Sequence, residues 1–277
     1  MLMAGTSKRQ WVVHVVLITM LFLTFLPYLF MVMTSTKTNA QMVHQTWIPT
    51  WPIAWANYAG AWGLVSRDIV NTLIVAGTSI AGILTTATLA AYAFARLRFR
   101  GKEVLYMLIL ALLMVPSVLM LIPLYLEIVT MRLTNNYFGL ILPYIAMGQP
   151  FTILLTRGAI ATLPEELFEA ARLDGASEWI ALRAIAVPLI GPVLISAGIM
   201  NFLTIWNDYV LPFVVMNDPN KWTVSLGVAQ LQASFGVTPQ WGVVFAGYVI
   251  ATIPLLVIFV LGMRYFVRGL TSASLSL

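Results

Sequence analysis

The strongest constraint on this chain is a series of long apolar stretches. A helix needs about 20 apolar residues to cross roughly 30 Å of hydrocarbon. Because unpaired backbone groups are too costly in lipid, each such stretch should be helical. Six stretches qualify, at residues 11–33, 71–95, 104–128, 137–157, 188–215 and 241–266. The sequence therefore predicts an all-α integral membrane protein with six transmembrane helices.

Composition supports lipid as the solvent. Only 9% of the residues are charged, whereas soluble domains carry about 25%. The net charge of +5 does not indicate nucleic acid, because the basic residues form short clusters between apolar stretches and no continuous stripe. The chain has no cysteine and only His14 and His44 as imidazoles, so we expect neither a metal site nor covalent catalysis. The first apolar stretch exceeds the core of a secretory signal, about 7–15 residues, and is interpreted as a retained span.

The basic residues also predict the orientation. An even number of spans places both termini on one side of the membrane. That side would hold Lys8, Arg9, Arg96, Arg98, Arg100, Lys102, Arg157, Arg172, Arg183, Arg264 and Arg268. The opposite side would hold Lys37, Arg67, Arg132 and Lys221. By the positive-inside rule, residues 1–10 and 268–277 are predicted to be cytoplasmic tails that flank a single permease domain at 11–267.

The segment at 161–187 is not explained by membrane insertion. It holds half of the acidic residues, namely Glu165, Glu166, Glu169, Asp174 and Glu178. Thr162 and Glu165 have capping-box spacing, and Pro164 suits a first helical turn, so a helix should begin here. Gly175 can adopt the left-handed conformation that closes a helix, and a second helix is expected from Ala176. The prediction is a helix, a sharp turn and a second helix.

One face of the first helix suits a protein partner. Ala170 and Ala171 have little side-chain bulk, so another surface can approach closely, and Glu169 offers a charge to a basic partner. A Glu-Ala-Ala triplet alone is also ordinary helix composition. The complete spacing is more specific: EAA at 169–171, three residues, Gly175, nine residues, Ile185, one residue, then VP at 187–188.

This spacing resembles the EAA loop of the permease subunits of ABC importers, with Val187 where the family has leucine. Four further sequence motifs resemble the carbohydrate-importer branch: LPEEL at 163–167, DGAS at 174–177, WNDY at 206–209 and RYFVRGLT at 264–271. That branch includes the smaller permease of the maltose transporter.

The resemblance implies the transmembrane fold of type I ABC importers, with a coupling helix in the loop at about 161–188 that docks on an ATPase. The residues carried over to this coupling role are Glu165, Glu166, Glu169, Ala170, Ala171, Asp174 and Gly175. The implied partners are a second homologous permease, two cytoplasmic ATPases that use ATP and Mg, and an extracytoplasmic solute-binding protein. The implied location is the cytoplasmic membrane of a bacterium or archaeon. This chain has no phosphate-binding loop of its own, so it is not expected to be an enzyme.

The solute pathway has two candidate residues, Asn207 and Asp208, which either line it or end the fifth span at water. For Asn71 and Gln149, hydrogen bonding between helices is the favoured interpretation. The expected solute is a sugar, and polyols or glycerol phosphate compounds are the alternatives. An ion-coupled secondary transporter is disfavoured because the spans hold few ionisable groups. A membrane enzyme lacks a recognisable catalytic motif.

Overall fold

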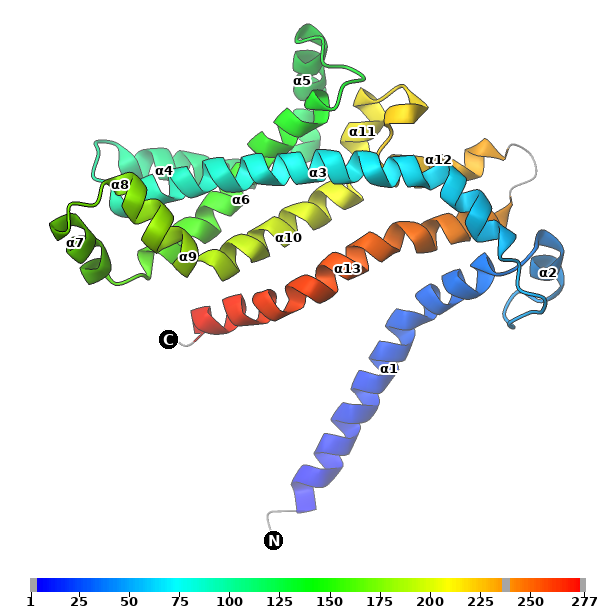
Figure 1. The fold of residues 1–277 in the computed structure, drawn as a ribbon. Coiled ribbons are helices and arrows are strands. Elements are labelled where there is room, and N and C mark those ends of the chain that lie inside the picture. Colours follow the sequence, from blue (N-terminus) through cyan, green and yellow to red (C-terminus); the bar gives the residue numbers. More distant parts are fainter. Residues whose placement is uncertain (1–3, 236–239, 275–277) are drawn as a thin grey trace. The chain divides into compact units, whose positions relative to one another are not determined.

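The computed structural model describes residues 4–235 and 240–274, and within these ranges the chain forms helices and no β-strand (Figure 1). The chain divides into two compact units, which are described separately. The first comprises Met1–Ser66 with Val228–Ile253, and the second comprises Arg67–Gly227 with Pro254–Leu277. Two long helices, α3 (Ala56–Arg96) and α13 (Trp241–Ser274), contribute to both units.

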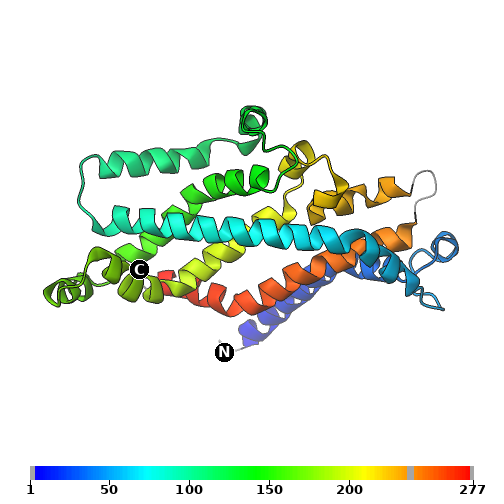
Figure 2. The same ribbon diagram turned by 45° about the horizontal axis from the view of Figure 1, so that its top comes forward.

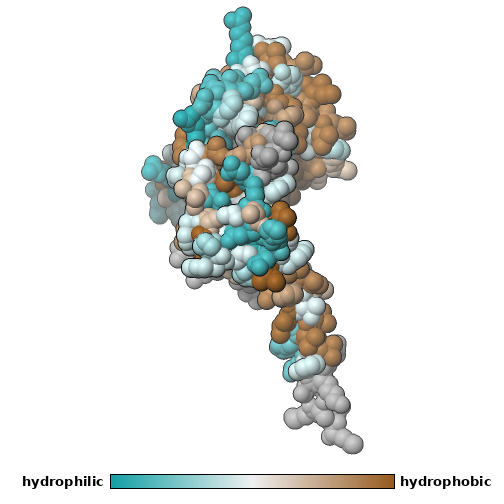
Figure 3. All heavy atoms as spheres, turned by 90° about the vertical axis from the view of Figure 1, so that its right-hand side faces the viewer, coloured by the Kyte–Doolittle hydropathy of each residue, from teal (hydrophilic) through white to brown (hydrophobic). Residues whose placement is uncertain are grey.

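The first unit contains α1 (Ala4–Ser35), α2 (Asn39–His44) and most of α12 (Val224–Ser234). Most of the exposed side chains along α1 from Trp11 to Val32 are hydrophobic, with a few polar ones between them (Figure 3). A helix whose apolar side chains are exposed along its length is suited to lipid. Beyond α1, the buried Lys37 donates to the carbonyl oxygens of Gln45 and Thr46 at 2.6 and 3.0 Å, which anchors the loop after α2.

The second unit is built around the later part of α3. Its other membrane helices are α4 (Lys102–Ala111), η1 (Leu112–Met114), α5 (Ser117–Thr130), α6 (Phe138–Ala161) and α10 (Gly191–Asn207), followed by α11 (Val210–Val215) and η3 (Pro219–Lys221). Polar side chains join these helices, as expected for Gln149, which donates to Thr86 on α3 at 2.8 Å. Asn201 on α10 likewise donates to Thr152 on α6 at 3.0 Å. Asn71 on α3 accepts from the hydroxyl of Tyr137, the N-cap of α6, at 2.8 Å. Its amide also donates to the carbonyl oxygens of Asn220 in η3 and of Trp222.

Four of the predicted spans are single long apolar helices: α1, α3, α6 and α13. The other two are bent. Lys102–Met114 meets α5 at 101°, and Glu178–Leu189 meets α10 at 75°. In Figure 2, α5 is seen end-on. Counting each bent pair as one crossing gives the six predicted spans.

The predicted end of the fifth span at residue 215 is wrong. The helix ends at Asn207, and α11 is a separate short helix. The cause is Asp208, whose extended backbone stops the helix and whose Oδ1 accepts from the amide of Val210 at 3.0 Å. This carboxylate therefore helps to begin α11 in the manner of an N-cap.

The predicted helix–turn–helix is present. It consists of α7 (Glu165–Leu173), a turn, α8 (Glu178–Ile180), the π-helix η2 (Ala181–Ala186) and α9 (Val187–Leu189). Gly175 has a φ of +82°, the left-handed conformation that the sequence predicted. The second helix begins at Glu178, after an N-cap at Ser177, and not at Ala176.

The predicted capping box is also wrong. Thr162 still belongs to the end of α6, and its hydroxyl donates back to the carbonyl oxygen of Ala159 at 2.8 Å. Pro164, and not Thr162, occupies the N-cap position of α7. The structure does not describe residues 1–3 and 275–277 of the predicted tails. It also does not describe the side chains of the RYFVRGLT motif at 264–271.

Candidate functional site

The α7 helix is fixed to the second unit through its apolar side. Phe168 is fully buried in a cluster that brings together α3, α6 and η2. The cluster consists of Ala91, Tyr92, Ile160, Phe168, Ala181, Leu182, Ala186 and Ile190. Figures 1 and 2 show α7 at the end of this unit, beyond the C-terminal end of α3.

A single arginine at the end of α3 reinforces this attachment. The guanidinium carbon of Arg96 lies 4.1 Å from the centroid of the Phe168 ring, and one of its nitrogens forms an ion pair with Glu165. Its other terminal nitrogen donates to the carbonyl oxygens of Ile160 and Leu163 at 2.7 and 2.6 Å. The last carbonyls of a helix lack intrahelical partners. Arg96 therefore satisfies the end of α6 while it holds the start of α7.

Two further side chains, Arg172 and Tyr92, stabilise the helix–turn–helix. Arg172, in the last turn of α7, forms ion pairs with Glu165 at 3.4 Å and Glu178 at 3.3 Å. Its hydrogen bond to Glu178 raises the pKa of Arg172 above its ordinary value. From α3, the Tyr92 hydroxyl donates to Glu178 at 2.6 Å. The sequence-predicted Glu165 is thus engaged within the chain.

The other predicted coupling residues face outward. Within the described residues, Glu166, Glu169 and Asp174 are exposed and form no ion pair. Ala170 is exposed and Ala171 is half-buried. The Leu173 side chain, which the sequence analysis did not single out, is 90% exposed although it is apolar. This outward surface of α7 combines acidic groups, small side chains and one apolar side chain, so it is suited to bind a basic protein surface with an apolar recess.

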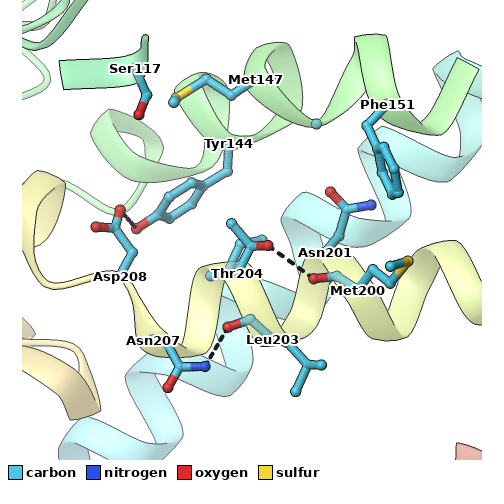
Figure 4. Close-up of a pocket in the computed structure, with 12 residues that line it drawn as sticks. Ser117, Tyr144, Met147, Phe151, Met200, Asn201, Leu203, Thr204, Asn207 and Asp208 are labelled. Atoms are coloured by element: carbon cyan, nitrogen blue, oxygen red, sulfur yellow. Dashed lines mark hydrogen bonds between the residues drawn. The ribbon is translucent and has the colours of Figure 1, made fainter. Parts of the chain in front are cut away.

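The second candidate site is an open cleft of about 740 Å³ in the second unit. Its walls come from the start of α5, from α6 and from α10 (Figure 4). Both predicted pathway residues line it. The side chain of Asp208 points toward Tyr144, whose hydroxyl donates to Oδ2 at 2.8 Å, and Asn207 donates back to the carbonyl oxygen of Leu203 at 2.7 Å (Figure 4).

The surface of the cleft is mainly apolar, with a minority of polar groups and little charge. Its polar lining residues are Ser117, Tyr144, Asn201, Thr204, Asn207 and Asp208, and the remainder are apolar or glycine. Asp208 is the single charged residue among the twelve that line it. Tyr144, Ser117 and Thr204 were not predicted, because nothing local distinguishes a wall residue from a packed one. No group of metal-binding side chains occurs in the part of the chain that the structure describes.

Comparison with known proteins gives consistent matches. Residues 82–272 match the family described as the binding-protein-dependent transport system inner membrane component. The chain is 33% identical over 275 residues to the probable ABC transporter permease protein YurM of Bacillus subtilis, across 96% of this chain and 90% of the relative. It is 30% identical over 262 residues to the diacetylchitobiose uptake system permease protein NgcG of Streptomyces coelicolor, across 92% of this chain and 86% of the relative.

Among solved structures, a chain of a bacterial ABC transporter involved in the import of the acidic polysaccharide alginate matches with a TM-score of 0.83. The two chains are 22% identical, and the match covers 94% of this chain and 98% of the other. At this identity, the match shows a shared fold.

Proposed function

This chain belongs to the family of inner-membrane components of binding-protein-dependent transport systems, and we propose that it is the permease subunit of an ATP-driven sugar importer. Its fold is the transmembrane fold of type I ABC importers, as the family resemblance implied. In the proposed assembly, its six spans form half of the solute pathway. A second homologous permease supplies the other half, and a solute-binding protein delivers the solute from outside.

The observation that carries the proposal is the helix–turn–helix at 165–189. Its first helix is exposed and acidic and is packed on a buried apolar cluster, in a chain that otherwise consists largely of apolar helices. In the proposed role, the outward surface of α7 docks on one of two cytoplasmic ATPases, which bind Mg and hydrolyse ATP. Glu166, Glu169 and Asp174 meet basic groups of the ATPase, and Ala170 and Ala171 allow close approach.

The orientation follows from this docking. The positive-inside distribution supports an orientation in which α7 and both termini lie on the cytoplasmic side of a bacterial or archaeal inner membrane. The proposed mechanism is alternating access, in which closure of the ATPases moves the coupling segments and reorients the spans. Asn207 and Asp208 then line the pathway on the far side from α7.

Two observations favour a sugar as the solute. The NgcG relative is described as part of a diacetylchitobiose uptake system. The cleft offers hydroxyls, amides and one carboxylate, which suit a neutral solute with many hydroxyl groups. Among its lining residues there is no lysine, arginine or histidine to bind a phosphate. The cleft therefore does not favour glycerol phosphate compounds as the solute.

The proposal is tested in proteoliposomes that contain the chain with its partner permease, ATPase and binding protein. A panel of radiolabelled neutral di- and oligosaccharides serves as the probe. We expect ATP-dependent uptake by the wild type and its loss in Glu169→Lys, with membrane insertion intact. Glu127→Lys, which changes an exposed glutamate on α5, is the matched control and should retain uptake. Uptake that continues without ATP would contradict the proposal, as would full activity of Glu169→Lys.

A further inference from the structure

Two arginines of similar chemistry lie at the ends of helices in the second unit, but they hold different elements. Arg157, near the end of α6, lies with its guanidinium carbon 4.0 Å from the centroid of the Tyr106 ring and pairs with Glu103 at 3.4 Å. It therefore joins α6 to α4, and its Nε also donates to the carbonyl oxygen of Phe94 on α3 at 3.5 Å. Arg96 makes the same two kinds of contact, but with Phe168 and Glu165, which belong to α7.

The contacts of Arg96 extend into a continuous polar chain. From Arg96 the chain passes through Glu165 to Arg172, then to Glu178, and returns to α3 at Tyr92. Tyr92 and Arg96 lie four residues apart, on the same face of α3. The α3 helix thus holds the helix–turn–helix at two points, the start of α7 and the start of α8.

The strength of this attachment depends on burial. The side chain of Arg96 is 7% exposed, and Tyr92 is 4% exposed. Charge-assisted hydrogen bonds in such surroundings are screened less by water than surface ion pairs. Arg172, Glu165 and Glu178 are about half exposed, at 42%, 51% and 47%. The two α3 residues are therefore the principal fixed points of the network.

We propose that Arg96 and Tyr92 are positioning residues for energy coupling, which fix the helix–turn–helix to α3 so that the two move as one body. This inference rests on the proposed function, and it assigns α3 as the helix that receives the movement of α7. Without these two side-chain contacts, α7 still docks on the ATPase, but it moves relative to α3, and α3 no longer follows its movement. ATP hydrolysis then continues while solute import falls.

The test uses the complete complex, with Arg96→Gln and Tyr92→Phe as the variants and Arg157→Gln as the matched control. Arg157→Gln removes the same ring contact and ion pair without touching the helix–turn–helix. The first measurement is the amount of radiolabelled saccharide imported per ATP hydrolysed, in proteoliposomes with saturating binding protein. A variant that merely misfolds lowers import and hydrolysis together, so their ratio isolates the positioning role. We expect the ratio to fall in Arg96→Gln and Tyr92→Phe and to match the wild type in Arg157→Gln.

The second measurement needs no solute. Amide hydrogen exchange of α7 in the complex should accelerate by about ten-fold or more in Arg96→Gln, because a hydrogen bond to a charged group is lost. In Arg157→Gln the exchange of α7 should be unchanged. Tyr92→Phe keeps the ring and removes one hydroxyl, so it reports on the contact to Glu178 even if Arg96→Gln does not assemble.

The two failures are distinguishable. If the wild-type complex shows no ATP-dependent import, the proposed function fails. If the wild type imports solute, but both variants retain its ratio of import to hydrolysis and its exchange of α7, only the positioning role is overturned. An equal fall of the ratio in Arg157→Gln would also overturn it, because the effect would then not depend on contacts to the helix–turn–helix.

Discussion

Replacing Phe168 by alanine should release α7 from the second unit. The Phe168 ring is fully buried in the cluster between α3, α6 and η2, with the Arg96 guanidinium 4.1 Å from its centroid. Truncating a buried phenylalanine costs about 3–5 kcal/mol, and the lost cation–π contact adds about 1 kcal/mol. Phe168 is the one buried side chain of α7, so this nine-residue helix has no other apolar anchor to compensate for the loss. The open state of α7 should therefore become populated while the membrane helices stay folded.

Hydrogen exchange of the α7 amides, followed by mass spectrometry on the assembled complex, measures this opening. A loss of about 3 kcal/mol corresponds to an acceleration of at least about 100-fold. The matched control is Leu173→Ala on the same helix, because Leu173 is 90% exposed and its truncation should change stability by no more than about 0.5 kcal/mol. Unchanged exchange in Phe168→Ala, or equal acceleration in Leu173→Ala, would refute the assignment of Phe168 as the anchor of α7.

Three further predictions concern the turn, the helix packing and the cleft. Gly175→Ala should destabilise the turn by about 1 kcal/mol, because the φ of +82° is unfavourable for a residue with a side chain. Gly175→Asn should destabilise the turn less, and hydrogen exchange of the turn measures both effects. Gly148→Val should destabilise the protein by about 1–3 kcal/mol, since a Cβ there would lie 2.6 Å from Ile83 Cδ1; thermal unfolding in detergent measures this, and an unchanged melting temperature would contradict the packing. Tyr144→Phe removes the donor to Asp208 and should alter the saccharide preference of uptake while ATP hydrolysis in the absence of solute stays normal; an unchanged preference would exclude this pair from solute recognition.

Apolar length was enough to predict most of the membrane helices, because the hydrocarbon thickness sets a minimum that few other structures meet. It did not locate the bends. Pro116 lies at the 101° break of the third span, yet Pro123, Pro143 and Pro150 lie inside helices. Proline alone therefore does not determine where a membrane helix turns.

The ends of polar segments were harder to predict. Thr162 and Glu165 have the correct spacing for a capping box, but Thr162 is the C-cap of α6 and Pro164 is the N-cap of α7. Proline also disfavours the helical conformation in the residue before it. Asp208 begins a new helix where hydropathy indicated continuity. In both cases the conformation of one or two residues determines the boundary, and hydropathy averaged over a span does not detect it.

Parts of the candidate site could be predicted from the sequence, and other parts could not. The turn at Gly175 and the outward position of Glu169 followed from local pattern. The contacts that hold α7 did not, because Arg96 and Glu165 are 69 residues apart in the sequence. Nothing near Arg96 distinguished it from the other basic residues of its cluster, which the positive-inside rule already explained.

The docking of α7 on an ATPase is the central claim, and site-specific cross-linking tests it most directly. The chain contains no cysteine, so Leu173→Cys carries a single thiol for a photoactivatable cross-linker. Glu127→Cys, on an exposed position of α5, is the control. In membranes that contain the complete complex, we predict a cross-link from position 173 to the nucleotide-binding subunit and none from position 127. No cross-link from position 173, or equal yields from both positions, would contradict the account.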